Sequence, residues 1–314
     1  MSSSAKVFAL HGALLVALFA AQFVVPSYHV TNLARIMVLS VFAMGYNIAF
    51  GYTGLLSLGH SLFFAAGMFG MGLPVWHLGM AGLPAFGLGL VAAGVLALAV
   101  GLLALRTAGV SFMIVTLMFA QAGHLLVMYY GRETGGDEGF TVDNAARRIM
   151  GLDLSTDTHR YMVALALFAV AMAVCLWLVK SPFGRVMVAM RENEERSRML
   201  GYNPFRVKLI ALVVSAIMSG AAGAAYGLLF GYVGGTFATI QYSILPLLYV
   251  LLGGAGTVLG PFFGALAMFY LTDIASGYTD AWLVLVGAAL VAVVLFAPKG
   301  LLGTLRERII PWLP

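Results

Sequence analysis

Long apolar stretches, separated by short polar connections, run along almost the whole chain. Ten of them are close to the roughly 20 residues that an α-helix needs to cross a membrane's hydrocarbon core. The pattern predicts an all-α, polytopic membrane protein with about ten transmembrane helices in a single domain, residues 1–314. The predicted spans are Phe8–Val25, Leu33–Phe50, Leu55–Leu73, Leu83–Leu105, Val110–Tyr130, Tyr161–Val179, Leu209–Phe230, Thr239–Leu252, Val258–Ile274 and Trp282–Phe296.

The composition supports the membrane assignment. Hydrophobic residues make up 62% and charged residues 9% of the chain, against about 45–50% and 25% in soluble domains. The 38 glycines suit close packing between helices in lipid. The first apolar stretch carries only Lys6 as a charged flank and lacks a small-residue cleavage site, so we expect a retained span rather than a signal peptide.

One charged segment, residues 180–208, interrupts this apolar pattern with seven Lys or Arg and three Glu. Ser181 and Pro182 are typical of a helix start, and Gly201 is typical of a helix end. The segment therefore predicts one short helix, supported by Glu192–Arg196 and Glu194–Arg198 pairs at four-residue spacing. Two interpretations are open: a solvated connecting helix, or a contact surface for a partner outside the membrane.

The distribution of Lys and Arg predicts the orientation, because cytoplasmic connections are enriched in these residues. With residues 180–208 inside, a path of ten spans places both termini in the cytoplasm and residues 131–160 in a periplasmic loop. The net charge of +5 then follows from topology and requires no nucleic-acid partner. The further basic residues placed inside are Lys6, Arg106, Lys299, Arg306 and Arg308.

Two Gly-rich segments predict broken or re-entrant helices, which membranes tolerate where protein covers them or they line a cavity. In the first, Gly51, Gly54 and Gly59 surround Ser57 and His60. They fit either a gate facing a path or close helix packing.

The second Gly-rich segment, Gly253–Gly264, presents the same two alternatives. It contains Gly254, Thr257 and Pro261, and the Thr257 hydroxyl is suited to bond backbone groups freed by a break.

Residues 131–160 start with the acidic residues Glu133, Asp137 and Glu138. They fit either a docking surface of complementary charge or an ordinary exposed loop. Their spacing is not that of a calcium loop. The chain offers no metal-ligand cluster, catalytic triad or paired catalytic carboxylates, so we expect neither metal, cofactor nor enzymatic activity.

Several of these segments resemble motifs of the branched-chain amino-acid permease family of ABC transporters, the LivM type. Residues 51–64 read GYTGLLSLGHSLFF, 134–140 read TGGDEGF, 253–265 read GGAGTVLGPFFGA and 298–303 read PKGLLG. Residues 181–208 resemble the family's cytoplasmic coupling segment. Leu55 departs from the family, which often carries Gln there.

This resemblance implies a permease subunit of an ATP-driven importer for branched-chain or related amino acids in the bacterial inner membrane. The chain lacks a G-x-x-x-x-G-K-[ST] loop, so ATP hydrolysis is expected in partner subunits. The resemblance implies two cytoplasmic ATPases, a second homologous permease in a heterodimer, and a periplasmic substrate-binding protein. The alternatives are the same importer type for urea or short amides and, as a third choice, a secondary carrier or channel.

The resemblance also implies roles for individual residues. Those expected to couple to the ATPases are Arg191, Glu192, Glu195, Arg198 and Gly201. Those expected at the translocation path or its gate are Ser57, Gly59, His60, Gly254, Thr257 and Pro261.

Overall fold

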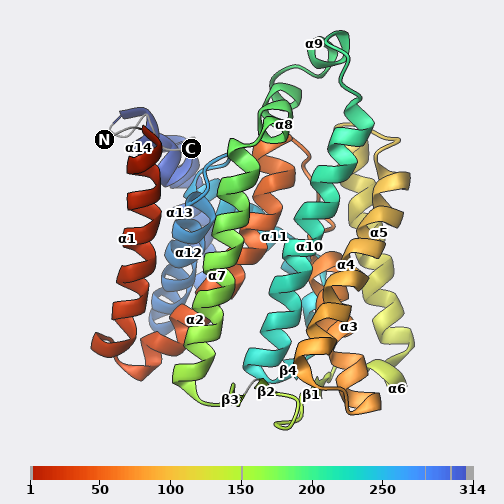
Figure 1. Cartoon of the computed structure of the whole chain (residues 1–314), viewed down its shortest axis with the longest axis vertical. Helices are drawn as coiled ribbons and strands as arrows, with labels where there is room; N and C mark the ends of the chain where they lie inside the picture. The colour runs from red at the N-terminus through yellow and green to blue at the C-terminus, as the bar shows by residue number, and fades with distance from the viewer. Residues whose placement is uncertain (1–2, 150, 280, 298, 309–314) are drawn as a thin grey trace.

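The computed structural model describes residues 3–149, 151–279, 281–297 and 299–308, and this part is predominantly helical (Figure 1). Seven helices are long and apolar enough to cross a membrane. They are α1 Ser3–Val24, α2 Ser27–Asn47, α3 His60–Leu78, α4 Gly82–Ala104, α5 Val110–Tyr129, α7 Asp157–Lys180 and α10 Pro204–Phe230. The other three predicted spans fall on α11 Ile240–Gly253, α12 Gly260–Tyr278 and α13 Trp282–Phe296.

The remaining elements are short. The helical ones are η1 Ile48–Tyr52, a π-helix, α6 Gly131–Thr134, α8 Pro182–Glu192, α9 Glu194–Met199, η2 Gly235–Ala238, a 3₁₀-helix, and α14 Gly300–Arg308. The strands are β1 Phe140–Thr141, β2 Arg148–Ile149, β3 Leu152–Asp153 and β4 Tyr232–Val233. β1 pairs antiparallel with β4, and β2 pairs antiparallel with β3.

Helix α10 lies at the centre of the bundle and packs against α2, α3 and α4. Glycines bring these backbones together: a Cβ added at Gly67 would lie 2.0 Å from the carbonyl oxygen of Gly220. A Cβ at Gly223 would lie equally close, 2.0 Å, to the carbonyl oxygen of Phe64. Small residues thus form the contact between α3 and α10, as is usual where helices pack in lipid.

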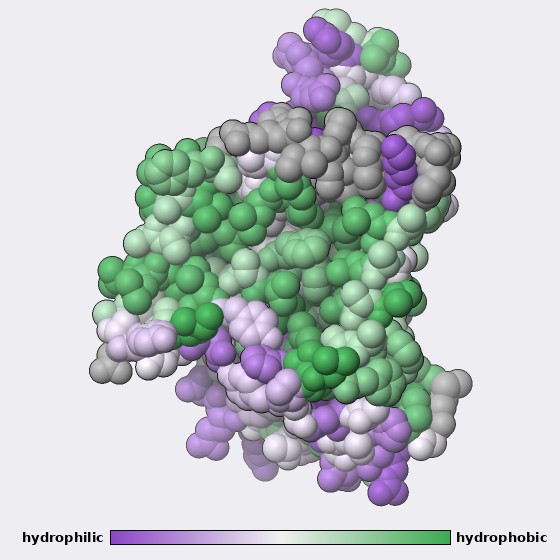
Figure 2. Space-filling model, turned by 90° about the vertical axis from the view of Figure 1, so that its left-hand side faces the viewer, coloured by the Kyte–Doolittle hydropathy of each residue, from purple (hydrophilic) through white to green (hydrophobic). Residues whose placement is uncertain are grey.

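The surface is divided as a membrane-spanning protein requires. Figure 2 shows a broad hydrophobic band across the middle of one face, with hydrophilic residues gathered at both ends. Helices α8 and α9 lie at one end of the bundle, and the four short strands lie at the other (Figure 1). The chain is therefore a multi-pass membrane protein, and its two polar ends face opposite sides of the membrane.

Three local predictions were wrong. The third span does not start at Leu55, because residues 53–59 leave the helical conformation and α3 begins at His60. The charged segment forms two helices rather than one, because Asn193 adopts an extended conformation with φ −157°. The segment 131–160 is not wholly a loop, since it contains α6 and three of the strands.

A buried arginine organises the end opposite α8 and α9. The Nε of Arg147 donates to the carbonyl oxygen of Leu228 at 2.9 Å, and its Nη2 donates to that of Leu229, also at 2.9 Å. These carbonyls belong to the last turn of α10, where backbone acceptors lack helical partners and a positive charge is favourable. Burial lowers the pKa of Arg147 from its ordinary value. The sequence predicted no role for this arginine.

Candidate functional site

The first Gly-rich segment forms a break between two membrane helices. Helix α2 ends in the π-helix η1, and residues 53–59 then run without helical structure to the start of α3. Gly54 has φ +76°, a conformation that L side chains rarely adopt, and the Thr53 hydroxyl donates to the carbonyl oxygen of Ile48 at 2.7 Å. The break is covered by protein, because a Cβ at Gly59 would lie 2.4 Å from the carbonyl oxygen of Thr116 in α5.

His60 and Ser57 are fully buried at this break. The Ser215 hydroxyl in α10 donates its single proton to the carbonyl oxygen of Gly45 at 2.6 Å. The 2.9 Å contact between His60 Nε2 and the same hydroxyl oxygen is therefore donated by the histidine. His60 Nδ1 then carries a lone pair, and it is buried without a hydrogen-bond partner among the described residues. Ser57 accepts a bond from the backbone N–H of Gly59 at 3.2 Å.

The second Gly-rich segment forms a similar break, residues 254–259, between α11 and α12. Gly254 has φ +121°. The Thr257 hydroxyl donates to the carbonyl oxygen of Gly254 at 2.8 Å and accepts from the backbone N–H of Gly260 at 3.1 Å. These bonds confirm that the hydroxyl satisfies backbone groups freed by the break. Pro261 is buried in the first turn of α12.

The two breaks touch each other through Asn47, although about 200 residues separate them. Asn47 Nδ2 donates to the carbonyl oxygen of Thr257 at 2.9 Å, and its Oδ1 accepts from the N–H of Gly256 at 3.0 Å. Gly51 permits this approach, because a Cβ there would lie 1.8 Å from Asn47 Oδ1 and 2.6 Å from the nitrogen of Gly256. Asn47 was not among the residues that the sequence predicted for the path or its gate.

Arg191, in the last turn of α8, contacts both breaks. Its Nη1 donates a hydrogen bond to the carbonyl oxygen of Gly51. A Cβ at Gly54 would lie 3.3 Å from Arg191 Cγ, and one at Gly256 would lie 3.1 Å from Arg191 Nη1. The charged segment is thereby attached to the point where the two membrane breaks meet.

The helices of the charged segment differ in how they are held. Helix α8 begins at the predicted cap, where the Ser181 hydroxyl accepts from the N–H of Gly184 at 3.1 Å. Its Met187 and Met190 are buried. Helix α9 begins at a second cap, where Asn193 Oδ1 accepts from the N–H of Arg196 at 2.8 Å.

The interruption of the helix at Asn193 determines which ion pairs form. Glu194 and Arg198 lie within one helix and form the expected pair at 3.5 Å. Glu192 precedes the extended Asn193, so it does not share a continuous helix with Arg196, and the structure shows no such ion pair among the described residues. Glu194 also pairs with Lys208 of α10 at 2.5 Å, which ties α9 to the membrane helix that follows it.

Helix α9 lies at the tip of the molecule (Figure 1), and its end exposes apolar side chains. Met199 is 85% and Leu200 is 72% exposed, and Gly201 follows with φ +90°. Glu192, Glu195 and the tip are all exposed. Protruding hydrophobic residues of this kind, surrounded by charges, are typical of protein contact surfaces. Met199 and Leu200 were not among the residues that the sequence predicted for contact with the ATPases.

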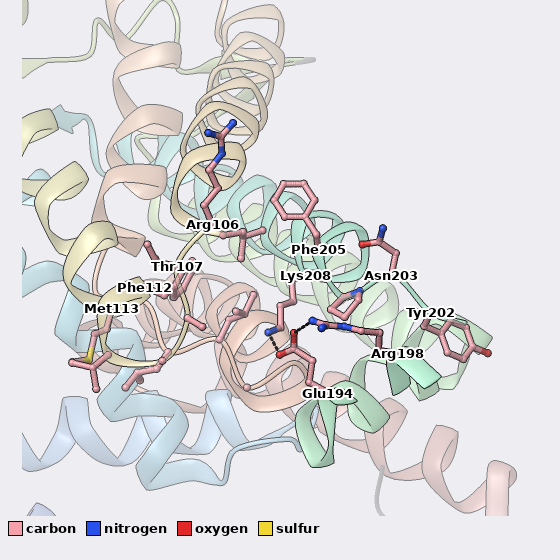
Figure 3. A pocket seen from close by; sticks show the side chains of 18 of the residues that line it. Arg106, Thr107, Phe112, Met113, Glu194, Arg198, Tyr202, Asn203, Phe205 and Lys208 are labelled. Carbon is pink, nitrogen blue, oxygen red and sulfur yellow. Dashed lines mark hydrogen bonds and ion pairs between the residues drawn. The ribbon is translucent and has the colours of Figure 1, made fainter. Parts of the chain in front are cut away.

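A cavity of about 820 Å³ lies under α9, where the turn between α4 and α5 faces the start of α10 (Figure 3). Glu194, Arg198 and Lys208 line one side, with Glu194 between the two basic groups. Gly54 and Leu55 of the first break also line it. Leu55, the position at which the sequence departs from the motif, is buried. Helix α9 thus borders a space that reaches the first break.

The predicted docking carboxylates lie at the opposite end. Glu133, Asp137 and Glu138 are all exposed. The backbone around them is fixed, because His77 Nε2 bonds the carbonyl oxygen of Glu133 at 2.8 Å and the Tyr232 hydroxyl donates to that of Glu138 at 3.0 Å. They present negative charge on a held loop, far from the charged segment.

Comparison with known proteins agrees with these features. A family model described as the branched-chain amino acid transport system permease component matches residues 28–294. The high-affinity branched-chain amino acid transport system permease protein LivM of Salmonella typhimurium is 29% identical over 95% of this chain and 75% of its own length. The corresponding LivM protein of Escherichia coli is 28% identical over the same shares.

A similarity over a shorter part of the chain is found with a permease of a different import system. The autoinducer 2 import system permease protein LsrC of Photorhabdus laumondii is 32% identical over 41% of each chain. No solved structure matches this chain. Because the family model spans most of the sequence, the chain belongs to the permease components of branched-chain amino acid transport systems, as an ABC transporter permease of the LivM type.

Proposed function

We propose that this chain is the membrane-spanning permease subunit of an ATP-driven importer for branched-chain or related amino acids. It forms part of the translocation path and receives motion from cytoplasmic ATPases. The observation that carries the proposal is the contact of Arg191 with Gly51, at the point where Asn47 joins the first break to the second. A single side chain thereby connects a water-exposed helix pair to both interruptions of the membrane helices.

The proposed topology has ten spans, with both termini and residues 180–208 in the cytoplasm and residues 131–160 in the periplasm of a bacterial inner membrane. The placement of α8 and α9 at one end of the bundle supports it, as does the position of the acidic segment at the other (Figure 1). The enrichment of Lys and Arg in residues 180–208 indicates that this end of the bundle faces the cytoplasm.

Two cytoplasmic ATPases supply the energy, and one of them contacts the exposed tip formed by α9 and Gly201. Glu192, Glu195 and Arg198 surround this tip with charge, whereas Arg191 transmits rather than docks. Motion of the tip reaches the breaks because α8 is anchored by its buried methionines and by Arg191. Breaks of this type are where alternating access hinges in transporters.

A second, homologous permease completes the path, and a periplasmic binding protein delivers the solute. Glu133, Asp137 and Glu138 offer that binding protein an acidic surface on a fixed loop. At the breaks, the groups suited to face the path are neutral: Ser57, His60 and Thr257. A path of this polarity suits a small zwitterion, which carries no net charge.

Reconstitution tests the proposal. The chain, its partner permease, the ATPases and the binding protein are assembled in proteoliposomes, and labelled leucine uptake is measured together with ATP hydrolysis. We expect leucine-loaded binding protein to stimulate both. Uptake of leucine by vesicles that contain this chain without any ATPase would refute the proposal, and stimulation by urea or amides in place of leucine would correct its substrate.

A further inference from the structure

A second cavity at the end of α8 is strongly basic. It has a volume of about 400 Å³ and lies where α8, α11, the second break and α14 meet, apart from the cavity under α9. Arg191, Lys299 and Arg306 line it, and the described residues that line it include no carboxylate. Leu251 and Ala255 add an apolar part to its wall.

The two arginines approach one another across a single glycine. Arg306 Nη1 donates to the carbonyl oxygen of Gly256 at 3.5 Å. Arg191 Nη1 would lie 3.1 Å from a Cβ added at the same residue, and it donates to the carbonyl oxygen of Gly51. Among the described residues, each guanidinium donates to one neutral carbonyl, and a guanidinium has five N–H donors. Two like charges beside one peptide repel each other, and a bound anion removes that cost.

Helix α14 carries Arg306, and Lys299 directly precedes it. A Cβ at Gly300 would lie 2.5 Å from the nitrogen of Gly254, and a Cβ at Gly254 would lie 2.7 Å from that of Gly303. The first turn of α14 is therefore packed directly on the second break, and both Lys299 and Arg306 line the cavity beside it. The three basic residues come from two segments more than 100 residues apart, and the fold keeps them together.

We propose that this cavity binds the phosphate group of an anionic phospholipid. Planar guanidinium groups match phosphate oxygens in geometry and charge, and basic pockets between membrane helices on the cytoplasmic side suit lipid headgroups. Leu251 is 37% exposed, so an apolar surface lies next to the basic one, as a headgroup joined to acyl chains requires. Free phosphate offers the same anion without that apolar part.

The choice of a lipid rests on the proposed cytoplasmic location of α8 and α14, whereas the choice of phosphate rests on the side chains alone. A lipid held here bridges α14 and α8 at the junction of the two breaks. The anion contributes to holding Arg191 beside Gly51, and the membrane's content of acidic lipid then influences the coupling segment.

Native mass spectrometry of the full-length chain tests the site. The protein is released from nanodiscs of phosphatidylcholine that contain increasing fractions of phosphatidylglycerol, and retained lipid is counted. We expect preferential retention of phosphatidylglycerol by the wild type. Arg306→Gln weakens it about fivefold, the effect of one basic residue near a membrane surface, and Arg191→Gln combined with Arg306→Gln weakens it further. Arg306→Lys keeps most of the preference, which excludes general misfolding as the cause.

Arg185→Gln is the matched control, because Arg185 is an exposed basic residue on the same helix α8 that does not line the cavity. We expect it to leave lipid retention unchanged. If millimolar inorganic phosphate occupied the site and the protein showed no preference for phosphatidylglycerol, the site would be one for free phosphate. That result would overturn the proposal of a lipid ligand. Equal retention by the wild type and all arginine variants would overturn the site. No ATPase or solute takes part, so either result is independent of the transport proposal.

Discussion

Helices α8 and α9 are neighbours in one charged segment, yet they are built for different contacts. Helix α8 buries Met187 and Met190, and its last turn carries Arg191, which donates a hydrogen bond to Gly51 beside the first break. Helix α9 buries only Ser197 and leads to a tip where Met199 and Leu200 are exposed. Helix α8 is therefore part of the membrane domain, and the end of α9 is a surface that no described part of the chain covers.

The difference assigns separate tasks to the two helices. A surface that binds a partner needs exposed apolar residues, whereas a transmitting element needs fixed contacts with what it moves. If the assignment is right, changes in α8 and its contacts impair coupling while the ATPases still bind. Changes at the tip of α9 impair binding itself.

The largest effect is expected from Gly51→Ala, which disrupts the close approach of the two breaks. The new Cβ would lie 1.8 Å from Asn47 Oδ1 and 2.6 Å from the nitrogen of Gly256. The first atom belongs to a side chain that two hydrogen bonds hold in place, and the second is backbone. Overpacking of this kind costs about 3 kcal/mol. We expect leucine uptake to fall more than tenfold and the thermal midpoint in detergent to drop.

Gly87→Ala is the control, because a Cβ at Gly87 in α4 meets nothing within 4 Å. It should leave uptake and the midpoint near the wild-type values. Full uptake by Gly51→Ala would show that the two breaks need not lie as close as they do here.

The next largest effect is expected at the tip. Replacement of both Met199 and Leu200 by serine removes the exposed apolar surface, and covering such side chains contributes about 1.5–3 kcal/mol each when burial is complete. We expect the ATPases to bind at least tenfold more weakly in a pull-down or by interferometry, while the thermal midpoint of the permease stays the same. Val188→Ser, at an exposed position of α8, serves as the control. Undiminished ATPase binding by the double variant would place the docking surface elsewhere.

Arg191→Ala tests transmission directly. It removes a charged hydrogen bond to Gly51, which contributes about 1.5 kcal/mol or more, a factor of about ten. We expect ATPases to bind normally and hydrolyse ATP, with uptake per ATP reduced about tenfold. Arg191→Lys retains one charged donor and should recover part of the uptake. If instead Arg191→Ala abolished ATPase binding, α8 would be a docking element like α9, and the contrast between the helices would disappear.

The sequence predicts features that depend on neighbouring residues better than contacts between distant segments. Hydrophobic length alone predicted a helix at each of the ten positions, with bounds within several residues of those observed, because crossing lipid is a local requirement. The caps at Ser181 and Asn203 are local too, and the former was predicted. The break at Asn193 was missed, since the pattern of charges on either side of it is equally good for one helix.

The contacts that join distant segments were not predictable in this way. Asn47 lies about 200 residues from Gly256, and Arg191 lies about 140 residues from Gly51. The sequence indicates only that polar residues and glycines occur at these positions. Which of them meet depends on how α2, α8 and α11 pack. The contact of Asn47 was therefore not predicted, and Arg191 was expected to contact an ATPase instead of Gly51.

The smallest effect is expected at the junction of the two helices. Asn193→Ala removes the cap of α9, in which Asn193 Oδ1 accepts from the N–H of Arg196 at 2.8 Å, and loss of such a cap costs about 0.5–2 kcal/mol. Alanine also favours a continuous helix, which would swing the tip away from Lys208 and strain the Glu194–Lys208 pair. We expect ATPase binding and uptake to fall together by about two- to threefold. The tip is displaced, but the exposed Met199 and Leu200 and the bond from Arg191 to Gly51 are retained. Asn193→Asp keeps the capping oxygen and should behave as the wild type. A fall in uptake alone would mean that this junction transmits force, and the division of tasks would then lie within α9 rather than between the helices.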